Sequence, residues 1–225
     1  VVEVIDDLGG LDLNITQGEM NQINKYKKDV DGVTGKNTPN VTQYGLVHLD
    51  GTQATTYARI RKLSGDDFKR ASRQRIVLQA MLEKAKKANP ATLVKICNSM
   101  VDDISTTLSL DQMVSLAKDV TKYKISSTTG FPTDLTTKNM PRCGDTVIPA
   151  DLVTNVKKLH EYMFDDAAYT PSQTVQAISE TIVNTTGITA DSAKINTSDY
   201  NETVGATGTD EIQKGSETTG GTNVQ

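Results

Sequence analysis

The amino-acid sequence predicts an α/β fold from three observations. Several long stretches repeat apolar residues at helical spacing and end at a proline or a glycine. Short stretches in the first 50 residues alternate apolar with polar residues, as half-buried strands do. The chain has 225 residues, of which 36% are hydrophobic, and this length suffices to bury one core.

The N-terminal region is predicted to be mainly extended. Val1–Ile5 is rich in β-branched residues and is followed by a Gly-Gly turn, so we expect a strand there. Leu11–Ile15 alternates apolar and polar residues and is predicted as a second strand. Residues 29–40 contain two glycines and a proline, which predicts a loop, and Val41–Leu49 is predicted to be extended.

Helices are predicted over most of the remaining body. Thr52–Ala58 is expected to form two helical turns, and the clearest helix runs from Asp67 to about Ala88, before a proline. The apolar stripe of this long helix is interpreted as core: Ile76, Val77, Ala80 and Met81. Residues 128–144 are predicted to form a polar loop. Further helices are expected over residues 90–101, 110–120, 150–164 and 172–184.

Charge and composition divide the chain near residue 184. Residues 185–225 hold two lysines against six acidic residues, a net charge of −4, whereas residues 1–184 balance 22 basic with 22 acidic residues. The segment 185–225 is rich in Thr, Ser and Gly and lacks an apolar period, so it buries too little apolar surface to offset the entropy of ordering. We therefore predict a folded body over 1–184 and a flexible acidic tail over 185–225.

Several kinds of site are excluded by composition. Two cysteines and two histidines do not supply two complete pairs at zinc-ligand spacing, and no glycine-rich turn is followed by Gly-Lys-Ser/Thr as in a P-loop. No stretch approaches the roughly 20 apolar residues of a membrane span.

His48 and His160 lack a neighbouring nucleophile motif and are interpreted as structural or surface residues. Cys97 and Cys143 are compatible with a disulfide or with two free thiols.

Five of the six arginines lie between Arg59 and Arg75, and this cluster is the main functional signal. If residues 57–61 are extended, period two places Tyr57, Arg59 and Arg61 on one face. Two guanidinium groups side by side repel each other, so this arrangement favours an anion between them.

The helix that follows carries a second group of candidates. Asp67, Arg70 and Gln74 share one helical face, and Arg73 is offset from it by about 60°. A short turn containing a glycine can fold the first arginines over the helix N-terminus, which makes a phosphate or pyrophosphate site. Asp67 can hold an arginine in place or act on a proton of the acceptor. The alternative is an ordinary solvated basic face, the role expected of Arg75.

Three motifs carry a family resemblance. They are VIDDLGGL at residues 4–11, LDGTQATTYARIR at residues 49–61 and DFKRASRQ at residues 67–74. In this order and spacing they resemble the LytR–CpsA–Psr family of cell-wall enzymes from Gram-positive bacteria. The match is dense over residues 1–85 and loose over 86–184.

The resemblance implies a three-layer α/β/α sandwich with a central mixed sheet, incomplete in this chain. It implies a phosphotransferase that moves anionic glycopolymers, such as wall teichoic acid or capsule, from a polyprenyl-pyrophosphate carrier to peptidoglycan. By motif position, Arg59 and Arg61 bind the pyrophosphate, and Arg70, Gln74 and Arg73 complete the cradle. Asp67 orients them or acts in catalysis. A hydrophobic tunnel holds the lipid.

The resemblance also implies parts that this sequence lacks. We expect a membrane-anchoring helix upstream, on the extracytoplasmic side of the cell membrane, and Mg²⁺ bound by acidic residues of an upstream half. The sequence is thus interpreted as the C-terminal part of the catalytic domain, inactive on its own. Two other readings are a non-catalytic module that binds polyprenyl phosphate or anionic polymer, and a DNA-binding regulator, which the absence of a large basic surface disfavours.

Overall fold

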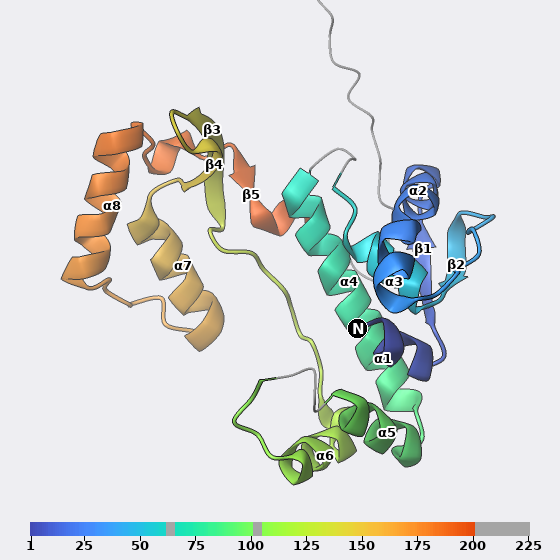
Figure 1. The fold of residues 1–225 in the computed structure, drawn as a ribbon. Coiled ribbons are helices and arrows are strands. Elements are labelled where there is room, and N and C mark those ends of the chain that lie inside the picture. The colour runs from blue at the N-terminus through green and yellow to red at the C-terminus, as the bar shows by residue number, and fades with distance from the viewer. Residues whose placement is uncertain (62–65, 101–104, 201–225) are drawn as a thin grey trace, which may run out of the picture. The chain divides into compact units, whose positions relative to one another are not determined.

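The computed structural model describes residues 1–61, 66–100 and 105–200. It divides into two compact units, and the chain passes from the first to the second between Tyr123 and Lys124 (Figure 1). The first unit contains α1 (Val2–Asp7), β1 (Leu11–Ile15), α2 (Gln17–Thr34), β2 (Gly45–Leu49), α3 (Gly51–Ala58), α4 (Asp66–Lys87), α5 (Pro90–Met100), α6 (Leu110–Lys118) and the 3₁₀ turn η2 (Val120–Lys122). The second contains β3 (Asp134–Met140), β4 (Gly144–Pro149), α7 (Leu152–Phe164), α8 (Gln173–Thr186), η3 (Ala190–Ser192), β5 (Ile195–Asn196) and η4 (Thr197–Tyr200).

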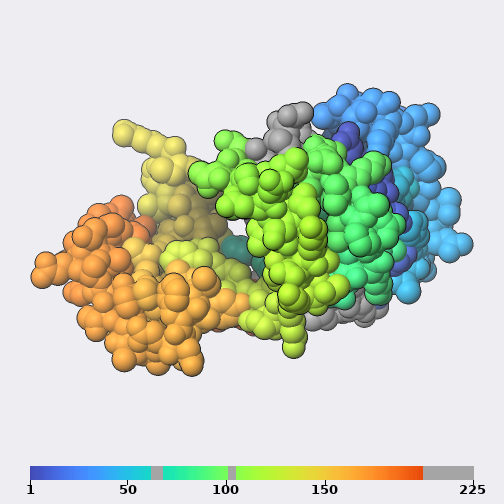
Figure 2. All heavy atoms as spheres, turned by 90° about the horizontal axis from the view of Figure 1, so that it is seen from below, coloured from blue at the N-terminus to red at the C-terminus, as the bar shows by residue number. Residues whose placement is uncertain are grey.

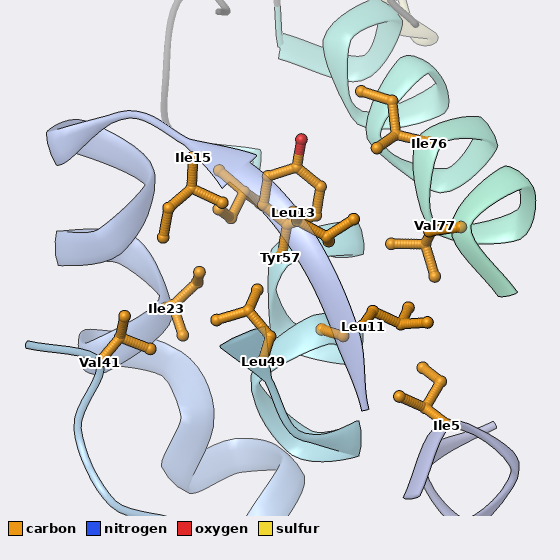
Figure 3. Packing of buried hydrophobic residues seen from close by; sticks show 13 residues of the cluster. Ile5, Leu11, Leu13, Ile15, Ile23, Val41, Leu49, Tyr57, Ile76 and Val77 are labelled. Atoms are coloured by element: carbon orange, nitrogen blue, oxygen red, sulfur yellow. The ribbon is translucent and has the colours of Figure 1, made fainter. Parts of the chain in front are cut away.

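The core of the first unit lies on one face of a two-stranded antiparallel sheet. Strands β1 and β2 pair from Leu11 with Leu49 to Ile15 with Gly45. The alternation predicted for β1 is confirmed, since Leu11, Leu13 and Ile15 are at most 2% exposed. Residues of α1, α2, α3 and α4 gather around them, as Figure 3 shows: Ile5, Ile23, Tyr57, Ile76 and Val77. The core stripe predicted on α4 is thus confirmed.

The predicted strand at Val1–Ile5 is wrong, because these residues begin α1. Val2, Val4 and Ile5 are buried, so packing outweighs the extended preference of β-branched residues. The Asp6 carboxylate also accepts a hydrogen bond of 2.7 Å from the backbone N–H of Gly51. This contact holds α1 against the start of α3, a constraint that no local pattern reveals.

The predicted loop at 29–40 is wrong in its first half. Helix α2 continues to Thr34 and ends at Gly35, which is left-handed with φ 70°. A capping box starts the helix, with Thr16 and Glu19 each bonding the other's backbone N–H. Asn24 then pairs with both backbone groups of Val41 at 2.8 Å, which anchors the segment leading to β2.

Helices α5 and α6 pack against each other at the surface of the first unit (Figure 2). Ile96 is the buried residue of α5, and no residue of α6 is buried. A Ser109–Gln112 capping box begins α6, close to the predicted start of that helix. Cys97 is half-buried on α5 and Cys143 is exposed, and both are free thiols.

The second unit corrects the polar loop predicted over 128–144. Residues 134–149 form an antiparallel hairpin of β3 and β4, and β5 pairs with the other edge of β3. The fully buried Asn155 of α7 fixes the hairpin, since its amide bonds both the N–H and the carbonyl of Asp134 at 2.9 Å. His160 stacks on Tyr169 with ring centroids 3.3 Å apart, in keeping with the structural role expected of it.

Regular structure continues beyond the predicted boundary at residue 184. Helix α8 runs to Thr186, and β5 belongs to the sheet of the second unit. The predicted tail therefore contains folded residues up to Tyr200, and residues 201–225 lie outside the described part of the chain.

The predicted α/β class is confirmed. In the described residues both sheets are antiparallel, and the face of the β1–β2 sheet that carries Leu46 and His48 is exposed. The mixed central sheet with two covered faces is thus incomplete in this part of the chain.

Candidate functional site

A pocket of about 140 Å³ lies where α2 meets the end of α3. Helix α2 contributes Tyr26, Asp29 and Val30 to its wall, and the other described lining residues are Thr56, Arg59, Ile60 and Arg61. The two arginines that the sequence singled out most strongly therefore share one cavity with a carboxylate, a phenol and a hydroxyl.

The end of α3 determines how these arginines are presented. Arg59 caps the helix in the right-handed conformation, and its N–H donates to the carbonyl of Thr56 at 3.0 Å. Tyr57 and Ile60 are 2% and 3% exposed, whereas Arg59 and Arg61 are exposed. The prediction of an extended segment with Tyr57 on the arginine face is wrong, because the helix turns Tyr57 into the core.

The α2 wall of the pocket is held by a buried polar network. Lys27 donates to the carbonyl of Thr38, and the Thr38 hydroxyl donates to Asp31 at 2.7 Å. All three side chains are buried. The hydrogen bond from the Thr38 hydroxyl lowers the pKa of Asp31, while its desolvation acts in the opposite direction. The helical turn that carries Tyr26, Asp29 and Val30 is thus bonded to the segment beyond it.

Arg73 has a different place from the one predicted. Its side chain is 3% exposed, and its Nε donates to Oε1 of Glu19 at 2.7 Å. The same carboxylate closes the capping box of α2. Arg73 therefore joins α4 to α2 inside the protein, and it is not among the described residues that line the pocket.

The remaining predicted residues lie on α4 outside the described lining of the pocket. Arg70 is half-buried and Gln74 is exposed, and their role in the anion cradle stays a prediction. Asp67 belongs to the first turn of α4, but its side chain lies outside the described part of the structure, as does the glycine turn at 62–65. Arg75, expected at the surface, is half-buried.

The sequence patterns did not single out Tyr26, Asp29 and Thr56 as pocket residues. Thr56 lies within the second family motif and was available as a signal. Tyr26 and Asp29 lie in a segment that carries no motif, and only the packing of α2 on α3 brings them to the arginines.

Among the described residues, no group of three or more His, Cys, Asp or Glu side chains is placed to hold a metal ion. Asp29 is the one carboxylate of the described pocket lining. Because Mg²⁺ is often held by one or two carboxylates together with substrate phosphates, the Mg²⁺ site that the resemblance implies stays a prediction. In the same described ranges, no helix has the length and apolar character needed to cross a membrane.

Comparison with known proteins places this pocket in a family context. A model of the LytR_cpsA_psr family matches residues 1–160, which include all the described residues of the pocket lining. The chain belongs to the LytR–CpsA–Psr family. The resemblance read from the three motifs is therefore confirmed.

Two curated relatives carry names that state an activity. The chain is 27% identical over 176 residues to the polyisoprenyl-teichoic acid–peptidoglycan teichoic acid transferase TagV of Bacillus subtilis (strain 168), covering 75% of this chain and 41% of the relative. It is 31% identical over 105 residues to the corresponding transferase TagU of Bacillus mycoides (strain KBAB4), covering 42% and 34%. The chain thus spans well under half the length of these relatives.

Two solved structures are similar in outline. A structure of TagT bound to LIIa-WTA matches with a TM-score of 0.46 and 22% identity, over 83% of this chain and 57% of the other. The crystal structure of Bacillus subtilis TagV matches with a TM-score of 0.49 and 21% identity, over 76% and 61%.

Proposed function

We propose that this chain is the arginine-bearing part of a phosphotransferase that attaches an anionic glycopolymer from a polyprenyl-pyrophosphate carrier to peptidoglycan. The observation that carries the proposal is the shared pocket of Arg59 and Arg61, within the region matched by the family model. The names of TagV and TagU, which are teichoic acid transferases acting on peptidoglycan, support the choice of substrate class.

The chemistry of the pocket suits a pyrophosphate. Arginine presents a permanently charged planar fork that bonds two oxygens at once, and two such forks match the oxygens of a diphosphate. In the described residues the Arg59 side chain makes no hydrogen bond or ion pair with protein. Its charge is therefore available to an anion that enters the pocket. Phosphoryl transfer depends mainly on positioning and charge neutralisation, which this arrangement supplies.

The proposal extends to the setting in which the reaction takes place. A polyprenyl carrier and a peptidoglycan acceptor imply work at the extracytoplasmic face of the cell membrane. The requirement for Mg²⁺ and the membrane anchor remain predictions from the family resemblance. Removal of divalent cations by EDTA, followed by restoration with MgCl₂, checks the first of them.

The test is a transfer assay in a protein that contains the whole of residues 1–225. A polyprenyl-pyrophosphate-linked saccharide serves as donor and a peptidoglycan oligosaccharide as acceptor, with formation of the phosphodiester followed by mass spectrometry. We expect product that depends on both substrates. Donor binding without product would instead favour the non-catalytic binding module, and absence of both binding and product would overturn the proposal.

A further inference from the structure

Asp29 is a negatively charged residue inside a pocket otherwise suited to anions. It lies on α2, is exposed, and lines the same cavity as Arg59 and Arg61. In the described part of the chain the Asp29 side chain makes neither a hydrogen bond nor an ion pair. A carboxylate placed there weakens the binding of a pyrophosphate, so donor affinity does not account for it.

The acceptor, which is the other substrate of the proposed reaction, does need a carboxylate of this kind. An acceptor hydroxyl must lose its proton as it attacks phosphorus, and an aspartate close to the phosphoryl group is a common solution for orienting that hydroxyl. We propose that Asp29 binds the acceptor hydroxyl and takes its proton during transfer. This inference rests on the proposed function.

The step balances within the two substrates and this side chain. The acceptor oxygen forms a bond to the phosphorus that bears the glycopolymer, and the bond from that phosphorus to the bridging oxygen of the pyrophosphate breaks. The electron pair of the broken bond leaves with the polyprenyl monophosphate. The acceptor proton passes to the Asp29 carboxylate and is released to solvent after the product departs. No oxidant or further reactant is required.

The fold holds Asp29 in a fixed position for this task. Its neighbour Val30 is 5% exposed, and Lys27 and Asp31 on either side are tied to Thr38. The backbone of this helical turn therefore has little freedom, and only the two torsions of the short aspartate side chain remain. A proton acceptor of this kind is effective when its position is set before the substrates bind.

Two variants separate this role from a simple effect of charge. Asp29→Asn removes the proton acceptor but keeps the shape, and Asp29→Glu keeps the carboxylate but displaces it. Asp111→Asn is the matched control, since Asp111 is an exposed helical aspartate of the same unit outside the pocket. Thermal melting of each variant confirms folding, which an exposed position should not disturb.

The measurements are kcat and KM in the transfer assay, together with donor binding by titration calorimetry using undecaprenyl pyrophosphate without acceptor. For Asp29→Asn we expect kcat to fall about 10²-fold, within the range of general-base catalysis, with donor affinity unchanged or higher. Asp29→Glu should retain more activity than Asp29→Asn, and Asp111→Asn should match the wild type.

Two results would overturn the inference while leaving the proposed function intact. In the first, Asp29→Asn tightens donor binding but leaves kcat unchanged, so Asp29 only adjusts the charge of the pocket. In the second, neither quantity changes, so Asp29 is a solvated surface residue. Failure of the wild type to transfer or to bind donor is a different result, which overturns the proposed function itself.

Discussion

Glu19 and Arg73 form an ion pair of 2.7 Å between α2 and α4, with both side chains buried. The second oxygen of Glu19 accepts the N–H of Thr16 at 3.0 Å, so a single carboxylate caps one helix and pairs with another. This pair sets the register between the helix that lines the pocket and the helix that carries Arg70 and Gln74. Arg73 thus supports the proposed site through the fold, without reaching its cavity.

Breaking this pair should destabilise the protein strongly. Glutamine at position 19 can still close the capping box with its single amide oxygen, but its NH₂ group then faces the Nε–H of Arg73, so Glu19→Gln removes both the charge and the hydrogen-bond acceptor of Arg73. Because Arg73 then remains buried beside a neutral partner, we expect a loss of about 3–5 kcal/mol in the free energy of unfolding, measured by urea denaturation. The matched control is Glu83→Gln, which breaks the exposed pair with Lys86 and should cost less than about 0.5 kcal/mol. Similar losses in both variants would contradict the role given to burial.

The surface cluster around Asp12 predicts a small dependence of stability on pH. The hydrogen bond from Lys84, followed by that from His48, lowers the pKa of Asp12. A lowered pKa in the folded state stabilises the protein above the unfolded value of about 3.9, and the benefit is lost as the pH falls through the folded pKa. The free energies of unfolding of the wild type and Asp12→Asn should therefore differ at about pH 6, and the difference should shrink as the pH falls through the folded pKa of Asp12.

The size of the difference in unfolding free energy between the wild type and Asp12→Asn provides a control. Asp12 and His48 are exposed, so we expect the free energies of unfolding of the wild type and Asp12→Asn to differ by less than about 1 kcal/mol at pH 6. About 1 M NaCl should reduce this difference further, because salt screens the pairs. A difference that grows as the pH falls would show that the carboxylate does not act through these pairs.

Gly51, the glycine of the second family motif, should tolerate no side chain. A Cβ at this position would lie 2.2 Å from the carbonyl oxygen of Val2, where α1 approaches the start of α3. We expect Gly51→Ala to lower the free energy of unfolding by about 1–3 kcal/mol. Gly32→Ala on α2 meets nothing within 4 Å and should be neutral or stabilising by up to about 1 kcal/mol. Equal stability of the two variants in urea denaturation would refute the proposed clash.

Loss of either pocket arginine should impair transfer. Arg59→Ala or Arg61→Ala removes one guanidinium from the charge-neutralising pair, and we expect activity to fall about 10²-fold or more. Arg142→Ala, an exposed arginine of the second unit, is the control and should remain close to the wild type. Arg75→Ala is also predicted to be nearly silent. Comparable losses in all four variants would indicate that positive charge acts diffusely.

Local sequence patterns were sufficient to predict several elements of this protein. The strand at Leu11–Ile15, the short helix after Asp50 and the long helix α4 follow from alternation, capping and apolar periodicity within each segment. The family motifs also selected Arg59 and Arg61, which do share a pocket. These features depend on residues close together in the chain, so they are readable from the sequence.

Tertiary structure decided the rest, because it depends on contacts between distant segments. Val2–Asp7 is helical since its apolar side chains pack in the core, against their extended preference. Arg73 is withdrawn from the site by Glu19, a partner 54 residues away, and Asp29 reaches the arginines only because α2 packs on α3. The sequence by itself determined which residue types the site offers, and burial and long-range pairing determined which of them face the cavity.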